Sequence, residues 1–151
     1  MRLTTLCYIE KAGAWLMLHR TKKEHDQSHD KWLGIGGKLE DRESPTECML
    51  REVKEESGLT LTRYQFRGIV TFVSDLWETE YMFLFTATQF EGTLCECTEG
   101  ELQWVPIEEV FYLNLWEGDR LFLERLAGNS TFFTLKVEYE GDRLTGWKFE
   151  S

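Results

Sequence analysis

The chain lacks the features of membrane and secreted proteins. It contains no run of about 18 consecutive apolar residues, so no membrane-spanning helix is predicted. Its N-terminal segment, MRLTTLCYIEKAGAWLML, has neither an uninterrupted apolar core nor a small-residue cleavage site. The four cysteines form no C-x-x-C pair and are too few for a disulfide scaffold. We therefore expect a cytoplasmic protein with reduced thiols.

Positive charge is also scarce. The chain has 17 Lys and Arg against 27 Asp and Glu, which gives a net charge of -10. A nucleic acid polymer needs a basic groove, so we expect no such partner. A small polyanion could still bind if metal ions screened its charge. The sequence does not indicate an oligomeric state.

Internal repeats, low-complexity tracts and linkers are absent as well. A chain of 151 residues is long enough to form one hydrophobic core. We therefore predict a single domain over residues 1–151.

The segment Gly37–Leu59 contains the strongest local signals. Ser44 can cap a helix, Pro45 suits the first helical position, and Glu47 completes a capping box. Gly58 can adopt the left-handed conformation that ends a helix. These residues predict a well-capped helix between Ser44 and Gly58.

This helix has an acidic stripe beside an apolar one. At about 100° per residue, Glu52, Glu55 and Glu56 share one sector, next to the apolar Met49 and Val53. Like charges at this spacing, near a helix C-terminus, are unfavourable by a few tenths of a kcal/mol each. A divalent cation would reverse that repulsion, and hard oxygen ligands suit Mg²⁺ or Mn²⁺. For the three glutamates alone, a solvated helix face is the simpler alternative.

The three glutamates belong to a longer pattern. Gly37, five residues, Glu43, seven residues and then REVKEESGL over 51–59 match, at every position, the signature of the Nudix hydrolases. Seven fixed identities at fixed spacing should occur by chance in less than about one such chain in a million. The chain therefore resembles this family, which implies an α/β fold, an α/β/α sandwich with a mixed central sheet. It also implies a Mg²⁺-dependent pyrophosphohydrolase.

The resemblance implies a metal site. Its ligands would be the carbonyl of Gly36 and the carboxylates of Glu52, Glu55, Glu56 and Glu99. Glu55 and Glu56 would be the main ligands, and Glu52 a ligand or the general base. A further acid precedes a tryptophan in the family, for which Glu99 is the first candidate and Glu101 the second. The choice of general base between Glu52 and Glu99 stays open.

Four other residues complete the expected catalytic region. The planar guanidinium of Arg51 can hold a carboxylate at two points, and Glu43 is its expected partner. By resemblance, this pair braces the loop and the helix. Arg20 and Lys38 are candidate phosphate contacts, with ordinary surface cations as the alternative.

The elements WLGIGGK and LWEGD and the overall length resemble the MutT branch of the family, which includes the oxidised purine nucleoside triphosphatases. The resemblance implies that Trp116 stacks on a purine and Asp119 hydrogen-bonds its edge. The simpler alternatives are a core aromatic and a first-turn acid. Leu33 replaces an asparagine of the purine-selective relatives and cannot recognise a guanine edge, so selectivity for an oxidised base rests on the resemblance alone.

The expected substrate is therefore a nucleoside triphosphate, including oxidised purine ones such as 8-oxo-dGTP. Two alternatives remain. One is hydrolysis of another nucleoside diphosphate linked to X, such as ADP-ribose or a dinucleotide. The other is a nucleotide-binding module without turnover.

The rest of the chain alternates between strands and turns. Strands are predicted over Thr4–Ile9, Trp15–Arg20, Tyr64–Ser74, Tyr81–Thr88, Leu102–Val105 and Phe133–Tyr139, with a last strand ending near Phe149. A second helix, following Leu115–Asp119 and ending at Gly128, should cover the sheet face opposite the first helix. The polar segment 21–31 is expected to be a loop, with His25 and His29 solvated.

Overall fold

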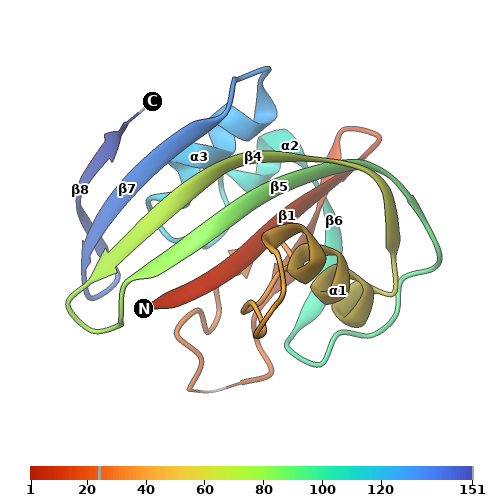
Figure 1. Cartoon of the computed structure of the whole chain (residues 1–151), viewed down its shortest axis with the longest axis horizontal. Coiled ribbons are helices and arrows are strands. Elements are labelled where there is room, and N and C mark those ends of the chain that lie inside the picture. Colours follow the sequence, from red (N-terminus) through yellow and green to blue (C-terminus); the bar gives the residue numbers. More distant parts are fainter. Residues whose placement is uncertain (24, 151) are drawn as a thin grey trace.

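The computed structural model describes residues 1–23 and 25–150. Eight strands form one mixed sheet in the order β3-β2-β1-β5-β4-β7-β8, with β6 beside β2 (Figure 1). The strands are β1 (Arg2–Lys11), β2 (Ala14–His19), β3 (Trp32–Leu33), β4 (Thr60–Ser74), β5 (Glu80–Glu91), β6 (Glu101–Pro106), β7 (Phe133–Glu140) and β8 (Arg143–Phe149). The helices are α1 (Pro45–Ser57), α2 (Ile107–Val110) and α3 (Asp119–Ala127).

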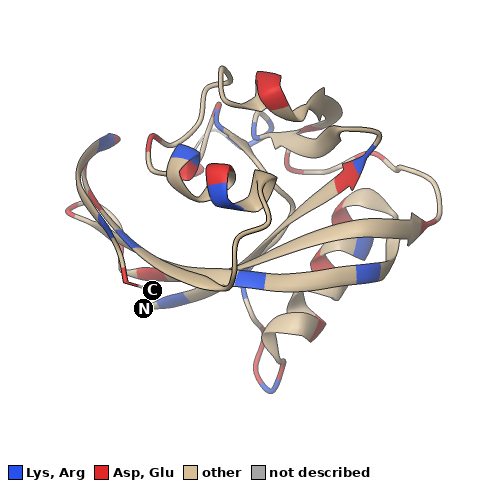
Figure 2. Ribbon diagram, turned by 90° about the horizontal axis from the view of Figure 1, so that it is seen from above, with Lys and Arg blue, Asp and Glu red and all other residues tan. Residues whose placement is uncertain are grey.

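Helices cover both faces of the sheet, as Figure 2 shows. Successive side chains of a strand point to opposite faces, and β1 illustrates the result. Leu6 and Tyr8 pack in a cluster with Phe122 of α3. Cys7 and Ile9 pack in a second cluster with Met49 and Val53 of α1. The predicted α/β/α sandwich with a mixed sheet is confirmed.

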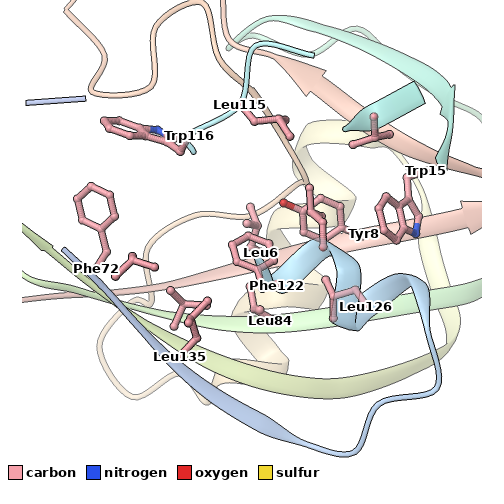
Figure 3. Close-up of a cluster of buried hydrophobic side chains, with 14 of the residues drawn as sticks. Leu6, Tyr8, Trp15, Phe72, Leu84, Leu115, Trp116, Phe122, Leu126 and Leu135 are labelled. Atoms are coloured by element: carbon pink, nitrogen blue, oxygen red, sulfur yellow. The ribbon is translucent and has the colours of Figure 1, made fainter. Parts of the chain in front are cut away.

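The cluster beneath α3 is rich in aromatic residues (Figure 3). Tyr8 lies between Trp15 and Phe122, with ring centroids 5.4 and 6.1 Å away. At the other end of the cluster, Phe72 packs edge-on against Trp116, with 5.4 Å between the ring centroids. Phe72 and Trp116 also line a cavity at this end of the core.

The glycine-rich segment that follows β3 lies beside β1 in the sheet, at residues 35–38. The two strands pair only at Glu10↔Trp15 and Lys11↔Ala14, next to a turn at residues 12–13 in which both φ angles are positive. Farther along, the segment 35–39 takes the place beside β1 that β2 has left. Ile35 and Cys7 exchange two backbone hydrogen bonds of 2.9 and 2.7 Å.

The position of Gly36 shows why the segment 35–39 needs a glycine. A Cβ built at Gly36 would overlap the carbonyl oxygen of Thr5 in β1. On either side of it, Ile35 accepts a hydrogen bond from Cys7, and Gly37 accepts one from Thr5 at 2.9 Å. The backbone can therefore approach β1 this closely only without a side chain.

Several element boundaries differ from the sequence-based expectations. β2 ends at His19 instead of Arg20, and β4 begins at Thr60 instead of Tyr64. Two short elements, β3 and α2, were not predicted. β3 has two residues, and its pairing with β2 at Leu18↔Leu33 is a long-range contact that no local pattern marks. No helix in the described part of the chain is long and apolar enough to cross a membrane.

Candidate active site

Helix α1 begins and ends as its sequence predicts. The Ser44 hydroxyl accepts a hydrogen bond from the Glu47 amide at 3.1 Å, and the Glu47 carboxylate accepts one from the Ser44 amide at 2.9 Å. Gly58 closes the helix with φ of 81°. Met49 and Val53 are fully buried against the sheet. This packing fixes the direction of the acidic stripe.

The three glutamates of the acidic stripe differ in burial and in their partners. Glu56 is 8% exposed, and its Oε2 is buried without a hydrogen-bond partner among the described residues. Burial, a hydrogen bond with Glu99 and the charge of Glu99 raise the pKa of Glu56 to about 10. Burial also raises the pKa of Glu52. The charge of Glu52 also contributes to the raised pKa of Glu56, so the two carboxyl groups repel each other in their ionised forms.

Glu99 meets this stripe from the loop before β6. Burial opposes its ionisation, but the hydrogen bond with Glu56 and the charges of Arg20 and Lys23 hold its pKa below the usual value. Arg20 Nη1 lies 3.3 Å from a Glu99 oxygen, and Lys23 Nζ lies 3.2 Å from the other. Glu101 is exposed on β6. Glu99 is therefore the acid that the fold brings to the helix.

Arg51 organises the solvent side of the helix. It forms a two-point ion pair with Glu43, with N···O distances of 2.6 and 2.9 Å. The hydrogen bond from Arg51 is the main reason that the pKa of Glu43 falls to about 2. Arg51 Nη1 also lies 2.7 Å from Glu52 and 3.3 Å from Glu55. The expected Arg51–Glu43 pair is present.

Glu55 is placed differently from the other two glutamates. Its side chain is 59% exposed and is directed toward Arg51. No three His, Cys, Asp or Glu side chains within residues 1–23 and 25–150 converge as a group that could hold a metal ion. Glu56 does interact pairwise with Glu99 and with Glu52, whereas Glu55 lies apart beside Arg51.

The donor chemistry nevertheless fits a divalent cation. Within residues 1–23 and 25–150, Glu56 Oε2 has no hydrogen-bond partner, and leaving a buried carboxyl oxygen unpaired is unfavourable. The neighbouring donors are the carboxylates of Glu52 and Glu99, and hard oxygen ligands of this kind are typical for Mg²⁺. Gly36 borders the same space.

A cavity of about 350 Å³ extends from these acids toward the aromatic end of the core. All five residues that were predicted to contact substrate line it, namely Arg20, Leu33, Lys38, Trp116 and Asp119. Gly36, Glu52 and Glu99 line its acidic end. Arg51, Glu43, Glu55 and Glu56 are not in its wall. The cavity therefore joins the candidate metal site to an aromatic pocket.

Trp116 is held firmly in this pocket. It is 6% exposed, and its Nε1 donates a hydrogen bond to the hydroxyl of Ser28 at 3.0 Å. Phe72 and Tyr139 pack against it edge-on. The hydroxyl of Tyr139 accepts a hydrogen bond from the Gly118 amide at 2.6 Å. Tyr139 thereby fixes the turn that carries Trp116.

Two carboxyl groups lie at the end of the pocket. Asp119, the first residue of α3, is buried, and burial followed by the charge of Glu80 raises its pKa to about 8. Glu80 is the first residue of β5, and it accepts a hydrogen bond of 2.7 Å from the Thr4 hydroxyl. Sequence reasoning missed Glu80, Thr4 and Tyr139. No motif marks them, because each occupies an ordinary strand position.

The sequence and the fold are similar to those of known proteins. A model of the NUDIX domain matches residues 2–126. An oxidized purine nucleoside triphosphate hydrolase of Danio rerio is 30% identical over 133 residues, which cover 87% of this chain and 83% of that protein. An uncharacterized Nudix hydrolase of Bacillus subtilis is 29% identical over 149 residues, covering 93% and 90%. The crystal structure of a MutT protein from Bacillus halodurans superposes with a TM-score of 0.88 at 25% identity, covering 99% of this chain and 98% of that one.

Proposed function

The chain belongs to the Nudix family of pyrophosphohydrolases, and from this we propose that it hydrolyses nucleoside triphosphates, purine ones in particular, to the monophosphate and pyrophosphate. The observation that carries the proposal is the continuity of the cavity. One end contains Glu52 and Glu99 beside Arg20 and Lys38, and the other contains Trp116. Acidic and basic groups thus lie where phosphates would bind, and an indole lies where a base would stack.

The residues of the acidic end have distinct proposed roles. Glu52, Glu56 and Glu99, with the carbonyl of Gly36, would hold Mg²⁺ or Mn²⁺, and Glu55 would join them by leaving Arg51. A bound cation neutralises the charge on phosphate oxygens and lowers the pKa of a bound water. Glu52 or Glu99 would accept the proton of the attacking water.

Cationic residues would position the phosphate chain. Arg20 and Lys38 line the cavity and would donate hydrogen bonds to phosphate oxygens, whose charge grows during the reaction. Arg20 is already held beside Glu99 and by Asp26, whose carboxylate lies 2.7 Å from Arg20 Nε. Arg51 and Glu43 would keep the helix and the preceding loop in register without touching the substrate.

Oxidised purine triphosphates are the finer part of the proposal. They are the substrates named for the Danio rerio relative. Trp116 and Asp119 would stack on the base and hydrogen-bond its edge. Leu33 contributes only apolar contact, so recognition of the base edge has to come from polar residues elsewhere in the pocket.

A nucleotide panel with Glu56→Gln tests the function. All assays contain Mg²⁺, and the pyrophosphate released from each nucleotide is measured. We expect turnover of purine triphosphates by the native protein and a loss of at least about a hundredfold in Glu56→Gln, the scale seen when a metal site is disturbed. Glu124→Gln, an exposed position on α3, is the matched control. Activity equal in Glu56→Gln and native protein would contradict the proposal.

Two other functions give different products. Release of two monophosphate units from ADP-ribose or a dinucleotide would favour hydrolysis of a nucleoside diphosphate linked to X. Nucleotide binding without turnover of any substrate would favour a binding module.

A further inference from the structure

A second buried carboxylate, Glu80, faces the base end of the cavity and has no part in the hydrolysis described above. Its residue is 9% exposed and lines the cavity. A buried carboxylate is unfavourable unless hydrogen bonds or opposite charges compensate it. Glu80 receives one hydrogen bond of 2.7 Å from Thr4 and lies 3.5 Å from Arg2 Nη1. A carboxylate has about four acceptor sites, so capacity for a ligand remains.

The partners of Glu80 fix its position. Arg2 stands opposite Glu80 in the register of β1 and β5, and Thr4 follows on the same strand. Arg2 is itself fixed by a 2.7 Å hydrogen bond to Gln27. Since these contacts come from the sheet itself, the carboxylate is held in place before any ligand arrives.

Asp119 supplies the complementary group. Lys31, Arg120 and Glu80 are the charged groups that act on it, and burial is the largest effect on its pKa. With a pKa of about 8, Asp119 is mainly a neutral acid at pH 7 and carries an O–H donor. The pocket therefore combines the acceptor oxygens of Glu80 with one acidic donor, the carboxyl group of Asp119.

The walls of the pocket are apolar. They consist of Leu6, Leu33, Phe72, Met82 and Trp116. Apolar and aromatic side chains can pack against a base but do not distinguish one base from another. Discrimination must therefore come from the polar groups at the end of the pocket.

We propose, on the basis of the proposed function, that Glu80 is a specificity-determining residue. It selects bases with two adjacent N–H donors, such as the amino group and the neighbouring ring N–H of guanine. Its carboxylate accepts from both donors, and Asp119 donates to the neighbouring carbonyl oxygen. Hypoxanthine has the same ring and carbonyl but lacks the amino group. Adenine presents only one donor beside a ring acceptor. Glu80 thus supplies the recognition that Leu33 cannot.

The test compares dGTP with dITP, whose base is hypoxanthine. The ratio of the two kcat/KM values is measured within one preparation, so the fraction of folded enzyme cancels. A hydrogen bond to a charged group predicts at least about a tenfold preference for dGTP in the native protein. In Glu80→Ala the ratio should fall to within about twofold of one, and in Glu80→Gln to an intermediate value. Glu78→Gln, an exposed position next to the same strand, should keep the native ratio.

Binding of the monophosphates gives a second readout that needs no turnover. Calorimetry without metal compares dGMP with dIMP on native protein and Glu80→Ala. A native preference for dGMP that disappears in Glu80→Ala supports the proposal even if no triphosphate is hydrolysed. A dGTP to dITP ratio in Glu80→Ala within about twofold of the native one overturns it, whatever the overall rate. Equal native affinity for the two monophosphates, or no binding of either, also overturns it.

Discussion

Arg51 joins Glu43 and Glu52 through one guanidinium group, with hydrogen bonds of 2.6 and 2.9 Å to the first and 2.7 Å to the second. Glu43 also accepts a hydrogen bond from the Glu40 amide, so the loop before α1 is tied to the acidic stripe on α1. The position of Glu52 therefore depends on a residue that has no contact with the cavity.

Arg51→Lys should reduce activity because a single ammonium cannot make the same set of planar contacts. We expect kcat/KM for the preferred triphosphate to fall by about ten- to a hundredfold, as when other supporting residues of metal sites are changed. Steady-state kinetics and thermal unfolding are the measurements. Arg63→Lys, at an exposed position of β4, is the control. Unchanged kinetics would show that Glu52 needs no support from Arg51.

Gly36→Ala should destabilise the fold. The added methyl group would overlap the Thr5 carbonyl, and overpacking of this kind reduces the free energy of unfolding by about 1–3 kcal/mol. Urea denaturation measures the change. Gly128→Ala is the control, because the nearest atoms to its Cβ would be 3.8 and 3.9 Å away. Equal stability of the two variants would mean that the segment 35–39 does not pack against β1 as described.

Arg67 offers a test of how α3 is anchored. This buried arginine of β4 donates hydrogen bonds to the carbonyls of Arg125, Leu126 and Gly128, at the C-terminal end of α3. Arg67→Met would remove these three hydrogen bonds, so the free energy of unfolding should fall by about 2–4 kcal/mol. Denaturant titration is the measurement, with Arg143→Met on the exposed hairpin as control. A loss no larger than the control's would contradict the anchoring role.

Tyr139→Phe should weaken nucleotide binding more than it slows the chemical step. The variant loses the acceptor for the buried Gly118 amide, which fixes the turn between Trp116 and Asp119. We expect KM to rise several-fold at nearly constant kcat, with about 1–2 kcal/mol less stability. Tyr64→Phe, on the exposed part of β4, is the control. A fall in kcat at unchanged KM would argue against a role in holding the base.

Asp119 predicts a pH dependence of stability. Its pKa is raised from 3.8 to about 8, so between these values the folded protein binds a proton that the unfolded chain releases. Its contribution to stability is therefore present at low pH and is lost as pH rises toward 8. Asp119→Asn should lose less stability than the native protein between pH 5 and pH 8. Thermal unfolding at both pH values measures this, and parallel changes in the two proteins would contradict the raised pKa.

The sequence-based predictions that the structure confirms rest on local signals. Ser44, Glu47 and Gly58 set the ends of α1 through contacts within a few residues, so the helix was predictable. Arg51 and Glu55 are four residues apart on α1, so their ion pair was also open to local reasoning, but the sequence analysis assigned Glu55 to the metal site alone. Glu80 was missed because its position in the pocket depends on pairing between β1 and β5, which are far apart in the chain.

The parallel pairing of β1 with β5 has a consequence for how the molecule forms. Arg2 lies opposite Glu80, and β4 pairs in parallel with β7, so central strands meet only after long loops have closed. Chains dominated by such distant contacts fold on the millisecond-to-second scale, more slowly than helical bundles. The capped helix can form early, but Glu56 meets Glu99 only when distant parts of the chain have come together. On refolding, catalytic competence should therefore emerge after helical content has already returned.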